Sequence, residues 1–228
     1  MTVLAMASRR KAIAIILGAL GVFGAIYGVY KWNYPTYAYR YRMTVEVEVD
    51  GQMKTGSGVI EGWVSRQPQF LPDVSLIQTG DRGDAVFVDL GDNRNLVALL
   101  AQGTFAEHAG FFSAIVPRHF QIKLLDFRQL AMLPGVRGKW SLAPNDLPTL
   151  VTFSNLADPA TVRTVRPDQF EQVFGQNVHW RGITIEMTTD AISWAIVEKL
   201  PWASRLIPRG GFIHPNRFTL NGSYLRRS

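Results

Sequence analysis

Histidines are the residues of this chain best suited to acid–base or metal chemistry near neutral pH, and the sequence contains four of them. They are His108, His119, His179 and His214. No two of them have the spacing of the HExxH, HxH or HxxxH motifs, and the chain contains no cysteine. The sequence therefore predicts no metal site, and nothing in it indicates a cofactor.

Three glycine-rich stretches resemble enzyme motifs without matching them. Ser57 lies between two glycines but lacks the G-x-S-x-G spacing, and it falls on a predicted strand instead of a strand-to-helix turn. Residues 56–62 lack the spacing of a dinucleotide-binding loop. Residues 135–140 have too few residues between their glycines for a P-loop, and Trp140 stands where Ser or Thr is required. We expect neither a catalytic serine nor a nucleotide site.

The densest polar stretch, residues 80–95, contains Asp81, Asp84, Asp89 and Asp92. Oxygen ligands crowded into a turn can hold Ca²⁺, but the spacing here matches no calcium-binding loop. Asp, Gly and Asn are also the residues that turns require. We therefore interpret this stretch as turn-rich.

An envelope hydrolase or transferase is the alternative that the polar residues leave open. Its site would form only in the fold, where side chains distant in sequence meet. Two or more of the following residues within hydrogen-bond reach in one pocket would indicate an enzyme: Asp84, Asp89, His108, His119 and His179. Because no motif joins them in the sequence, we favour a protein without catalytic activity.

The net charge of +6 suggests a nucleic-acid partner only until the charges are placed along the chain. Of the 24 Lys and Arg residues, six lie at or before Arg42, and all 18 Asp and Glu residues follow it. Residues 43–228 therefore carry equal numbers of each sign. Such a neutral domain lacks the basic surface that phosphate backbones require, so we expect no nucleic-acid partner.

The C-terminal part of the chain is basic. After Glu198 it contains Lys199, Arg205, Arg209, Arg217, Arg226 and Arg227. We interpret these residues as a solvated basic face, with contact to anionic lipid as the alternative.

An uncharged apolar run of 19 residues, 12–30, follows Arg9, Arg10 and Lys11. As a helix it would be about 28 Å long, close to the thickness of a hydrocarbon core. The run is longer than the apolar part of a signal peptide, and no small-x-small cleavage site follows it. The pattern predicts a single, uncleaved transmembrane helix.

The position of this run predicts four parts of the chain. They are a cytoplasmic tail (1–11), the transmembrane helix (12–30), an aromatic and basic interfacial segment (31–42) and a single globular ectodomain (43–228). The basic N-terminal flank favours an inner-membrane protein with a periplasmic ectodomain. Aromatic and basic residues expected at headgroup depth are Tyr30, Trp32, Tyr34, Tyr37, Trp202 and Arg205. A partner groove is the alternative for Trp202.

Small residues follow one side of the predicted span. They are Ala14, Gly18, Gly21, Gly24, Ala25 and Gly28, and the pair at 24 and 28 makes a GxxxG motif. Such a seam lets two helix backbones approach closely, so it predicts packing against a second copy, giving a homo-oligomer, or against another membrane protein. Glycine and alanine are also common in transmembrane helices that have no partner.

The ectodomain reads as an antiparallel, β-rich α+β domain with two or three short helices. Strands are expected at 43–49 and 53–60 around an Asp-Gly turn, at 85–90 and 95–100 around a polar turn, and at 149–153, 162–165 and 178–187. Residues 62–80 read as a loop with one short strand at 74–78, since they contain two prolines and two glycines. Helices are expected at 167–174, 189–200 and 105–115.

Several strings, in order along the chain, carry a resemblance to a known group. They are 41–49, 55–61, 86–91, 150–153, 158–159, 183–186 and 198–202. Together they resemble a group of uncharacterised, membrane-anchored proteobacterial proteins. The resemblance implies a bacterial envelope setting and a single domain, and it implies no activity or catalytic residue.

These observations lead to one expected function. We expect a non-catalytic, single-pass membrane protein of the envelope whose ectodomain makes protein contacts. A partner in the same membrane would fit this expectation, with the protein acting as an accessory or assembly factor of a membrane complex.

Overall fold

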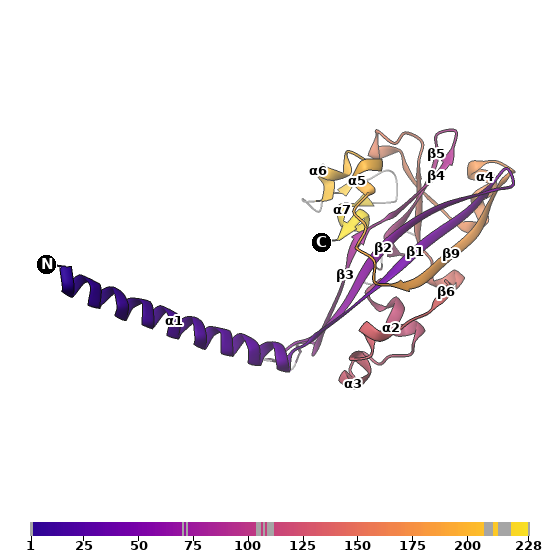
Figure 1. Cartoon of the computed structure of the whole chain (residues 1–228). Helices are drawn as coiled ribbons and strands as arrows, with labels where there is room; N and C mark the ends of the chain where they lie inside the picture. The colour runs from indigo at the N-terminus through magenta and orange to yellow at the C-terminus, as the bar shows by residue number, and fades with distance from the viewer. Residues whose placement is uncertain are drawn as a thin grey trace.

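A long N-terminal helix, α1 (Thr2–Asn33), projects from a mixed α+β domain in the computed structural model (Figure 1). The structure describes residues 2–69, 71, 73–103, 106, 108, 112–207, 212–213 and 220–227, with side chains from residue 16 onward except at 212 and 213. Within this described part, no helix is both long enough and apolar enough to cross a membrane. Residues 12–15 of the apolar run precede the described side chains.

Two antiparallel sheets form the framework of the domain. The larger has six strands in the order β12-β3-β2-β1-β9-β6 and the smaller has four in the order β4-β5-β7-β8. The larger sheet contains β1 (Thr36–Val49), β2 (Gln52–Arg66), β3 (Ile77–Asp84), β6 (Lys139–Ser141), β9 (Val178–Thr188) and β12 (Arg226–Arg227). The smaller contains β4 (Val86–Gly91), β5 (Arg94–Gln102), β7 (Pro148–Phe153) and β8 (Val162–Val165). A separate pair is formed by β10 (Phe212–Ile213) and β11 (Leu220–Asn221).

Short helical segments connect the strands. They are η1 (Phe112–Ala114), α2 (Ile115–His119), α3 (Phe127–Leu130), η2 (Leu133–Gly135), η3 (Pro144–Asp146), η4 (Pro159–Thr161), η5 (Pro167–Gln169), α4 (Phe170–Phe174), α5 (Ile196–Lys199), α6 (Ala203–Leu206) and α7 (Gly222–Leu225). The prediction of an α+β domain with antiparallel sheets and short helices is confirmed.

Both predicted hairpins form. Asp50 and Gly51 have φ of 51° and 77°, and Asp92 and Asn93 have φ of 52° and 59°. Two successive residues with positive φ match the right-handed twist of the flanking strands in a two-residue hairpin turn. The β1–β2 tip lies at the end of the domain opposite α1 (Figure 1).

The first hairpin is longer than predicted. β1 begins at Thr36, and β2 continues through Arg66 into residues predicted as loop. Gly62 lies against the ring of Tyr39 and Gly80 against the ring of Trp63, where a Cβ would approach ring atoms to 2.5 and 2.4 Å. These glycines make room for rings within paired strands, so reading them as loop residues was wrong.

The helix predicted at 189–200 is also mostly absent. Only Ile196–Lys199 is helical, because the preceding segment is held by β2. Ser193 accepts a hydrogen bond from the Val59 backbone on its Oγ at 2.9 Å and donates its own N–H to the Val59 carbonyl at 3.1 Å. The helix at 167–174 is confirmed as η5 and α4, and that at 105–115 lies partly outside the described residues.

Strand β5 separates two hydrophobic cores. Its even-numbered residues Leu96, Ala98 and Leu100 enter the core between the two sheets, which also contains Val47 of β1. Its odd-numbered residues Val97, Leu99 and Ala101 enter a second core, which α5, α6 and α7 cover. Side chains alternate between the faces of a strand, so a strand covered on both faces reads as a continuous apolar run.

The alternation along β1 generates a stability prediction. Val47 is completely buried and Glu46 is half-buried, so Val47→Asp should lower the free energy of unfolding by about 3 kcal/mol or more through an unpaired buried charge. Glu46→Gln should change it by about 0.5 kcal/mol or less. Thermal melts of both variants in mild detergent measure the difference. Equal losses would contradict the assigned burial of this strand.

Candidate functional site

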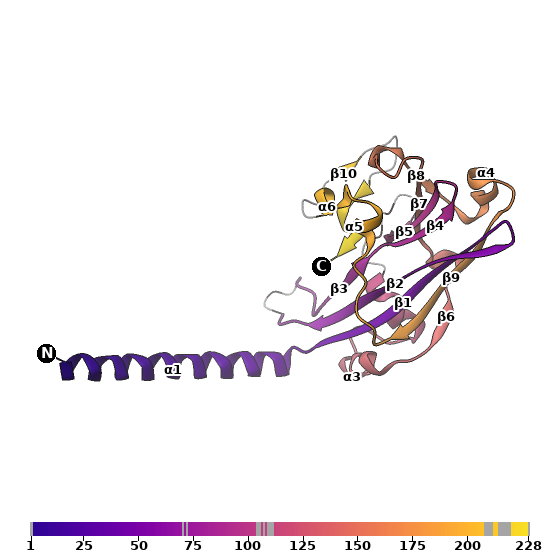
Figure 2. The ribbon, with the colours of Figure 1, turned by 45° about the horizontal axis from the view of Figure 1, so that its top comes forward.

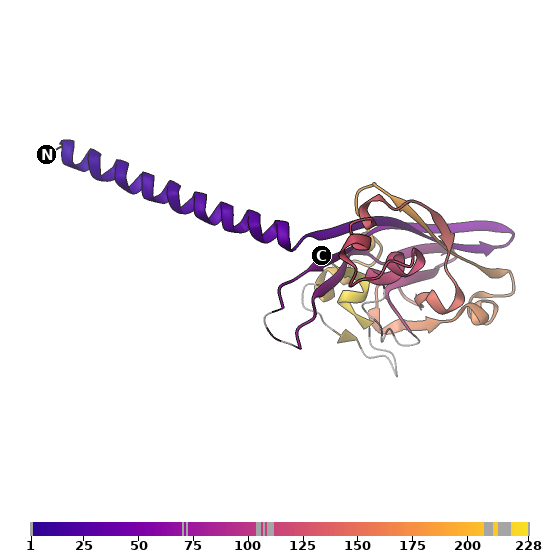
Figure 3. The same cartoon turned by 90° about the horizontal axis from the view of Figure 1, so that it is seen from below.

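Among the described residues, the largest group of exposed apolar side chains is on α1. Every described residue from Ile16 to Trp32 is exposed, and the helix extends away from the domain in all three views (Figures 1, 2 and 3). At about 100° per residue, Leu20, Val22 and Leu17 point in three different directions around the axis. A helix that is apolar on every side needs lipid or a partner around it.

The predicted small-residue seam lies open on this helix. A Cβ added at Gly18, Gly21, Gly24 or Gly28 would meet no atom within 4 Å, and Ala25 is exposed. Ala14 precedes the described side chains. No described part of the domain therefore covers the seam, which stays accessible to another helix.

The predicted interfacial residues have different surroundings. Tyr30 and Trp32 are exposed, and the rings of Tyr30 and Tyr34 lie 5.1 Å apart. Tyr37 is half-buried and packs against the core between the sheets. These aromatic residues therefore range from exposed helix positions to the first strand of the domain.

Trp202 lies at the start of α6 and packs against the second core, and Arg205 belongs to the same helix. The Trp202 indole N–H donates to the Leu156 carbonyl at 2.8 Å, and its ring centroid lies 5.6 Å from that of Phe153. Trp202 is half-buried, whereas Arg205 is exposed. Both border an open cavity of about 500 Å³ that Lys199 also lines.

Two of the five residues that an enzyme would use serve structural roles. The carboxylate of Asp84 accepts hydrogen bonds from Arg226 and from the Ile196 backbone N–H. Asp89 accepts the backbone N–H of Gly91 at 2.9 Å, closing a turn. Neither carboxylate contacts a described histidine.

The histidines also lie apart. His108 lines a cavity of about 680 Å³, His119 one of about 260 Å³ and His179 one of about 470 Å³. His119 stacks on Trp140 with centroids 3.9 Å apart, and His179 Nδ1 lies 3.1 Å from a Glu171 oxygen. The gathering in one pocket that would indicate an enzyme is not seen among the described residues, and His214 lies outside them.

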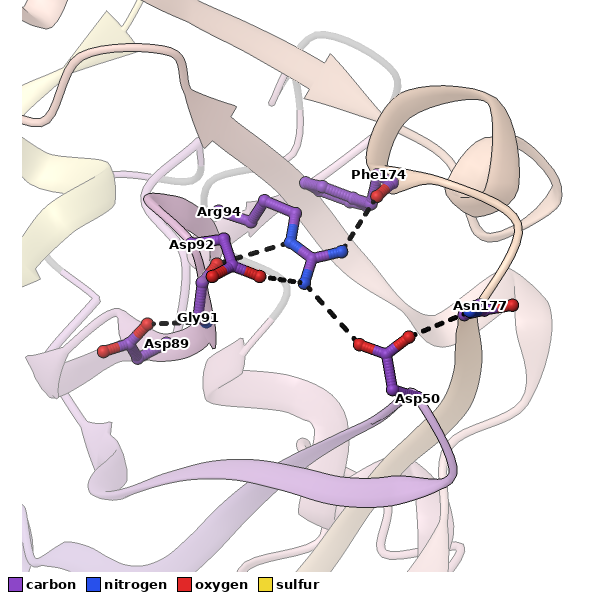
Figure 4. A network of polar contacts seen from close by, with 7 residues as sticks. All are labelled: Asp50, Asp89, Gly91, Asp92, Arg94, Phe174 and Asn177. Atoms are coloured by element: carbon purple, nitrogen blue, oxygen red, sulfur yellow. Dashed lines mark hydrogen bonds and ion pairs between the residues drawn. The ribbon is translucent and has the colours of Figure 1, made fainter.

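The polar stretch around residue 90 surrounds an arginine (Figure 4). The Arg94 guanidinium lies 3.0 Å from Asp92 and 4.0 Å from Asp50, and it donates to the Phe174 carbonyl at 3.1 Å. Asp50 also accepts a hydrogen bond from Asn177 at 2.9 Å. Arg94 thus joins the β1–β2 turn, the β4–β5 turn and the α4–β9 connection, and no described cluster of three carboxylates or imidazoles is arranged to hold a metal.

A second cluster ties the C-terminal strand to β3. Arg226 contacts both oxygens of Asp84 at 2.5 and 2.7 Å, and Arg227 contacts Asp81 at 2.5 Å. Arg227 also donates to the Leu100 carbonyl at 2.8 Å. Interpreting Arg226 and Arg227 as a solvated face was therefore wrong, because their partners are buried carboxylates.

Both aspartates are buried although they lie three residues apart on β3. Residues three apart on a strand point to opposite faces. Asp84 binds the backbone of Ile196 in the second core, whereas the charge of Asp81 acts on Tyr39 and Tyr41 in the core between the sheets. This end of β3 is therefore covered on both faces, which leaves Asp81 and Asp84 both buried. Asp84 and Arg226 are 142 residues apart in the sequence, so no local sequence pattern predicts that they pair.

Burial dominates the electrostatics of Asp81. Burial raises the pKa of Asp81 to about 6, although the nearby charge and hydrogen bond of Arg227 oppose the shift. Its Oδ2 atom has no hydrogen-bond partner within the described structure. Burial, together with the charge of Asp81, also raises the pKa of Tyr39 and Tyr41 well above the ordinary value.

Comparisons with protein-family models, with curated proteins and with solved structures gave no match.

The raised pKa of Asp81 predicts how stability responds to pH. The folded state binds the proton of the Asp81 carboxyl group more tightly than the unfolded state does. The stabilisation from this proton is therefore complete below about pH 3.8 and is lost as the pH rises through about 6. When the pH falls from about 7 to about 5, the free energy of unfolding of the wild type should rise by about 1 kcal/mol relative to that of Asp81→Asn. Denaturant unfolding of both proteins in detergent across this range measures the gain, and a constant difference would contradict it.

Proposed function

We propose that the protein is a single-pass membrane protein of the bacterial envelope, anchored by residues 12–30, whose domain acts by binding and without catalysis. The observation that carries the proposal is the exposure of α1: its apolar side chains point outward all round and no described domain residue covers them. Such a surface is unfavourable in water and suits a bilayer.

The proposed orientation places the domain in the periplasm. Arg9, Arg10 and Lys11 adjoin one end of the apolar run, and positive charge of this kind favours the cytoplasmic side. The resemblance to membrane-anchored proteobacterial proteins supports the same setting.

A binding role fits the domain better than an enzymatic role. The candidate carboxylates are occupied by structural hydrogen bonds, and the three described histidines line separate cavities. An open small-residue seam on α1 supports a partner helix in the same membrane, from a second copy or from another protein.

The first test concerns attachment. Full-length protein should stay in the membrane pellet after carbonate extraction, because the proposed span lies in the hydrocarbon core. A variant lacking residues 12–30 should be extracted, which provides the matched control. A soluble product beginning after Tyr30 would indicate a cleaved leader and contradict the anchor.

The second test concerns topology. A C-terminal alkaline phosphatase fusion in a bacterial host should be active, since this enzyme requires the periplasm, and a reporter that works only in the cytoplasm should be silent at the same position. The opposite pattern would place the domain in the cytoplasm.

A further inference from the structure

Exposed apolar side chains of the domain gather near the end of α1. Outside α1, seven large apolar side chains are exposed among the described residues. Five of them form what we term the base surface: Leu71, Val74, Leu76, Leu125 and Met132. They belong to the β2–β3 connection and to the segment around α3, and both segments lie toward the end of the domain that α1 joins (Figure 2).

Hydrogen bonds hold the β2–β3 connection beside the end of α1. The Arg66 backbone N–H donates to the Pro35 carbonyl at 3.1 Å, two residues beyond the last residue of α1. The Gln67 backbone N–H donates to the Leu76 carbonyl at 3.0 Å, which closes the connection at its neck. Figure 3 shows the connection next to the helix end. The position of the end of α1 along the helix axis therefore fixes the position of Leu71, Val74 and Leu76 along the same axis.

The side chain of Arg66 links the second segment to the same place. Its guanidinium carbon lies 4.3 Å from the centroid of the Phe127 ring and 5.9 Å from that of Tyr34. Phe127 belongs to α3, which lies between Leu125 and Met132 in the sequence. Arg66 thus connects both segments of the base surface to the C-terminal end of α1.

The charges at this end favour an anionic partner. Lys31, Arg66, Lys123 and Arg128 form no ion pair with a described acidic side chain, whereas Arg40, Arg42 and Arg82 on the sheet are each paired. The acids within the two segments are Asp73 and Asp126, and Asp126 is engaged in capping α3 through its carboxylate. A net positive charge therefore surrounds the exposed apolar side chains.

We propose that the base surface rests on the bilayer, with its apolar side chains at headgroup depth and its cations against anionic lipid. This inference depends on the proposed anchor. Apolar side chains among cations are the pattern of a surface that binds an anionic membrane interface. The bilayer is also the partner whose position is set by α1 itself, so no separate binding event is needed to bring it to this surface.

The lack of cysteine in the chain permits a direct test with single-cysteine variants. Leu71→Cys and Leu125→Cys report on the base surface, Met53→Cys at the opposite β1–β2 tip is the matched exposed control, and Leu20→Cys reports on the span. Each full-length variant, carrying an environment-sensitive fluorophore, is reconstituted into vesicles of zwitterionic and anionic phospholipid. Lipids with a nitroxide quencher in the headgroup or deep in the acyl chain then measure depth.

The labels at Leu71 and Leu125 should be quenched by the headgroup nitroxide several-fold more strongly than the label at Met53. The label at Leu20 should be quenched by the deep nitroxide. If Leu71 and Leu125 behave like Met53 while Leu20 is quenched, the anchor stands and the base surface does not rest on the membrane. If the Leu20 label escapes the deep nitroxide, the anchor itself fails.

The contribution of charge is tested by a matched pair of substitutions. Arg128 lies in α3, between Leu125 and Met132 of the base surface, and Arg163 lies on β8; both side chains are exposed. In vesicles containing anionic lipid, Arg128→Glu should reduce headgroup quenching of the Leu125 label, and Arg163→Glu should leave it unchanged. Equal effects of the two substitutions would overturn the role of anionic lipid.

Discussion

The alternating burial of β1 is the constraint on which the rest of the structure depends. From Tyr39 to Val49 every second side chain is buried, and β1 pairs with β2 on one side and β9 on the other. A slip of one residue would turn Glu46 and Glu48 into the core. The register of β1 therefore fixes both neighbours, and because β1 follows α1 almost directly, it also fixes where the helix meets the domain.

Two arginine clusters hold the opposite ends of this framework. Arg94 joins three turns at the end far from α1, and Arg226 with Arg227 attaches the C-terminal strand to β3. Burying an ion pair removes both partners from water, and the attraction often does no more than offset that loss. The raised pKa of Asp81 indicates that burial outweighs the attraction of Arg227 there. We regard this pair as fixing the position of β12 more than adding stability.

Local patterns in the sequence predicted the parts of the fold that local forces determine. The two hairpins follow from alternation and turn residues, and the helix ending at Phe174 follows from Pro167 and Gly175 at its boundaries. The loop assigned to 62–80 was wrong only at its two ends, outside the connection between Arg66 and Ile77. There Gly62 and Gly80 lie in paired strands, against rings of the neighbouring strands.

The candidate site shows the same division between local and distant signals. The exposed apolar run was evident from composition, whereas the aspartates that receive Arg226 and Arg227 lie far from them in the sequence. The base surface was also not evident, because scattered leucines in two loops carry no periodic signal. Contacts between distant residues become visible only in the fold.

The order of the strands along the chain has a consequence for folding. β1 and β2 are adjacent in sequence, so both strands of their hairpin are synthesised before any other strand of the sheet. The other neighbour of β1 comes much later, since β9 begins at Val178 and Glu186 is the residue of β9 that pairs with Arg42. During that interval β1 has an unpaired edge and an uncovered row of valines, which are the features that promote aggregation. A chaperone acting on this protein would need to shield that edge until β9 arrives.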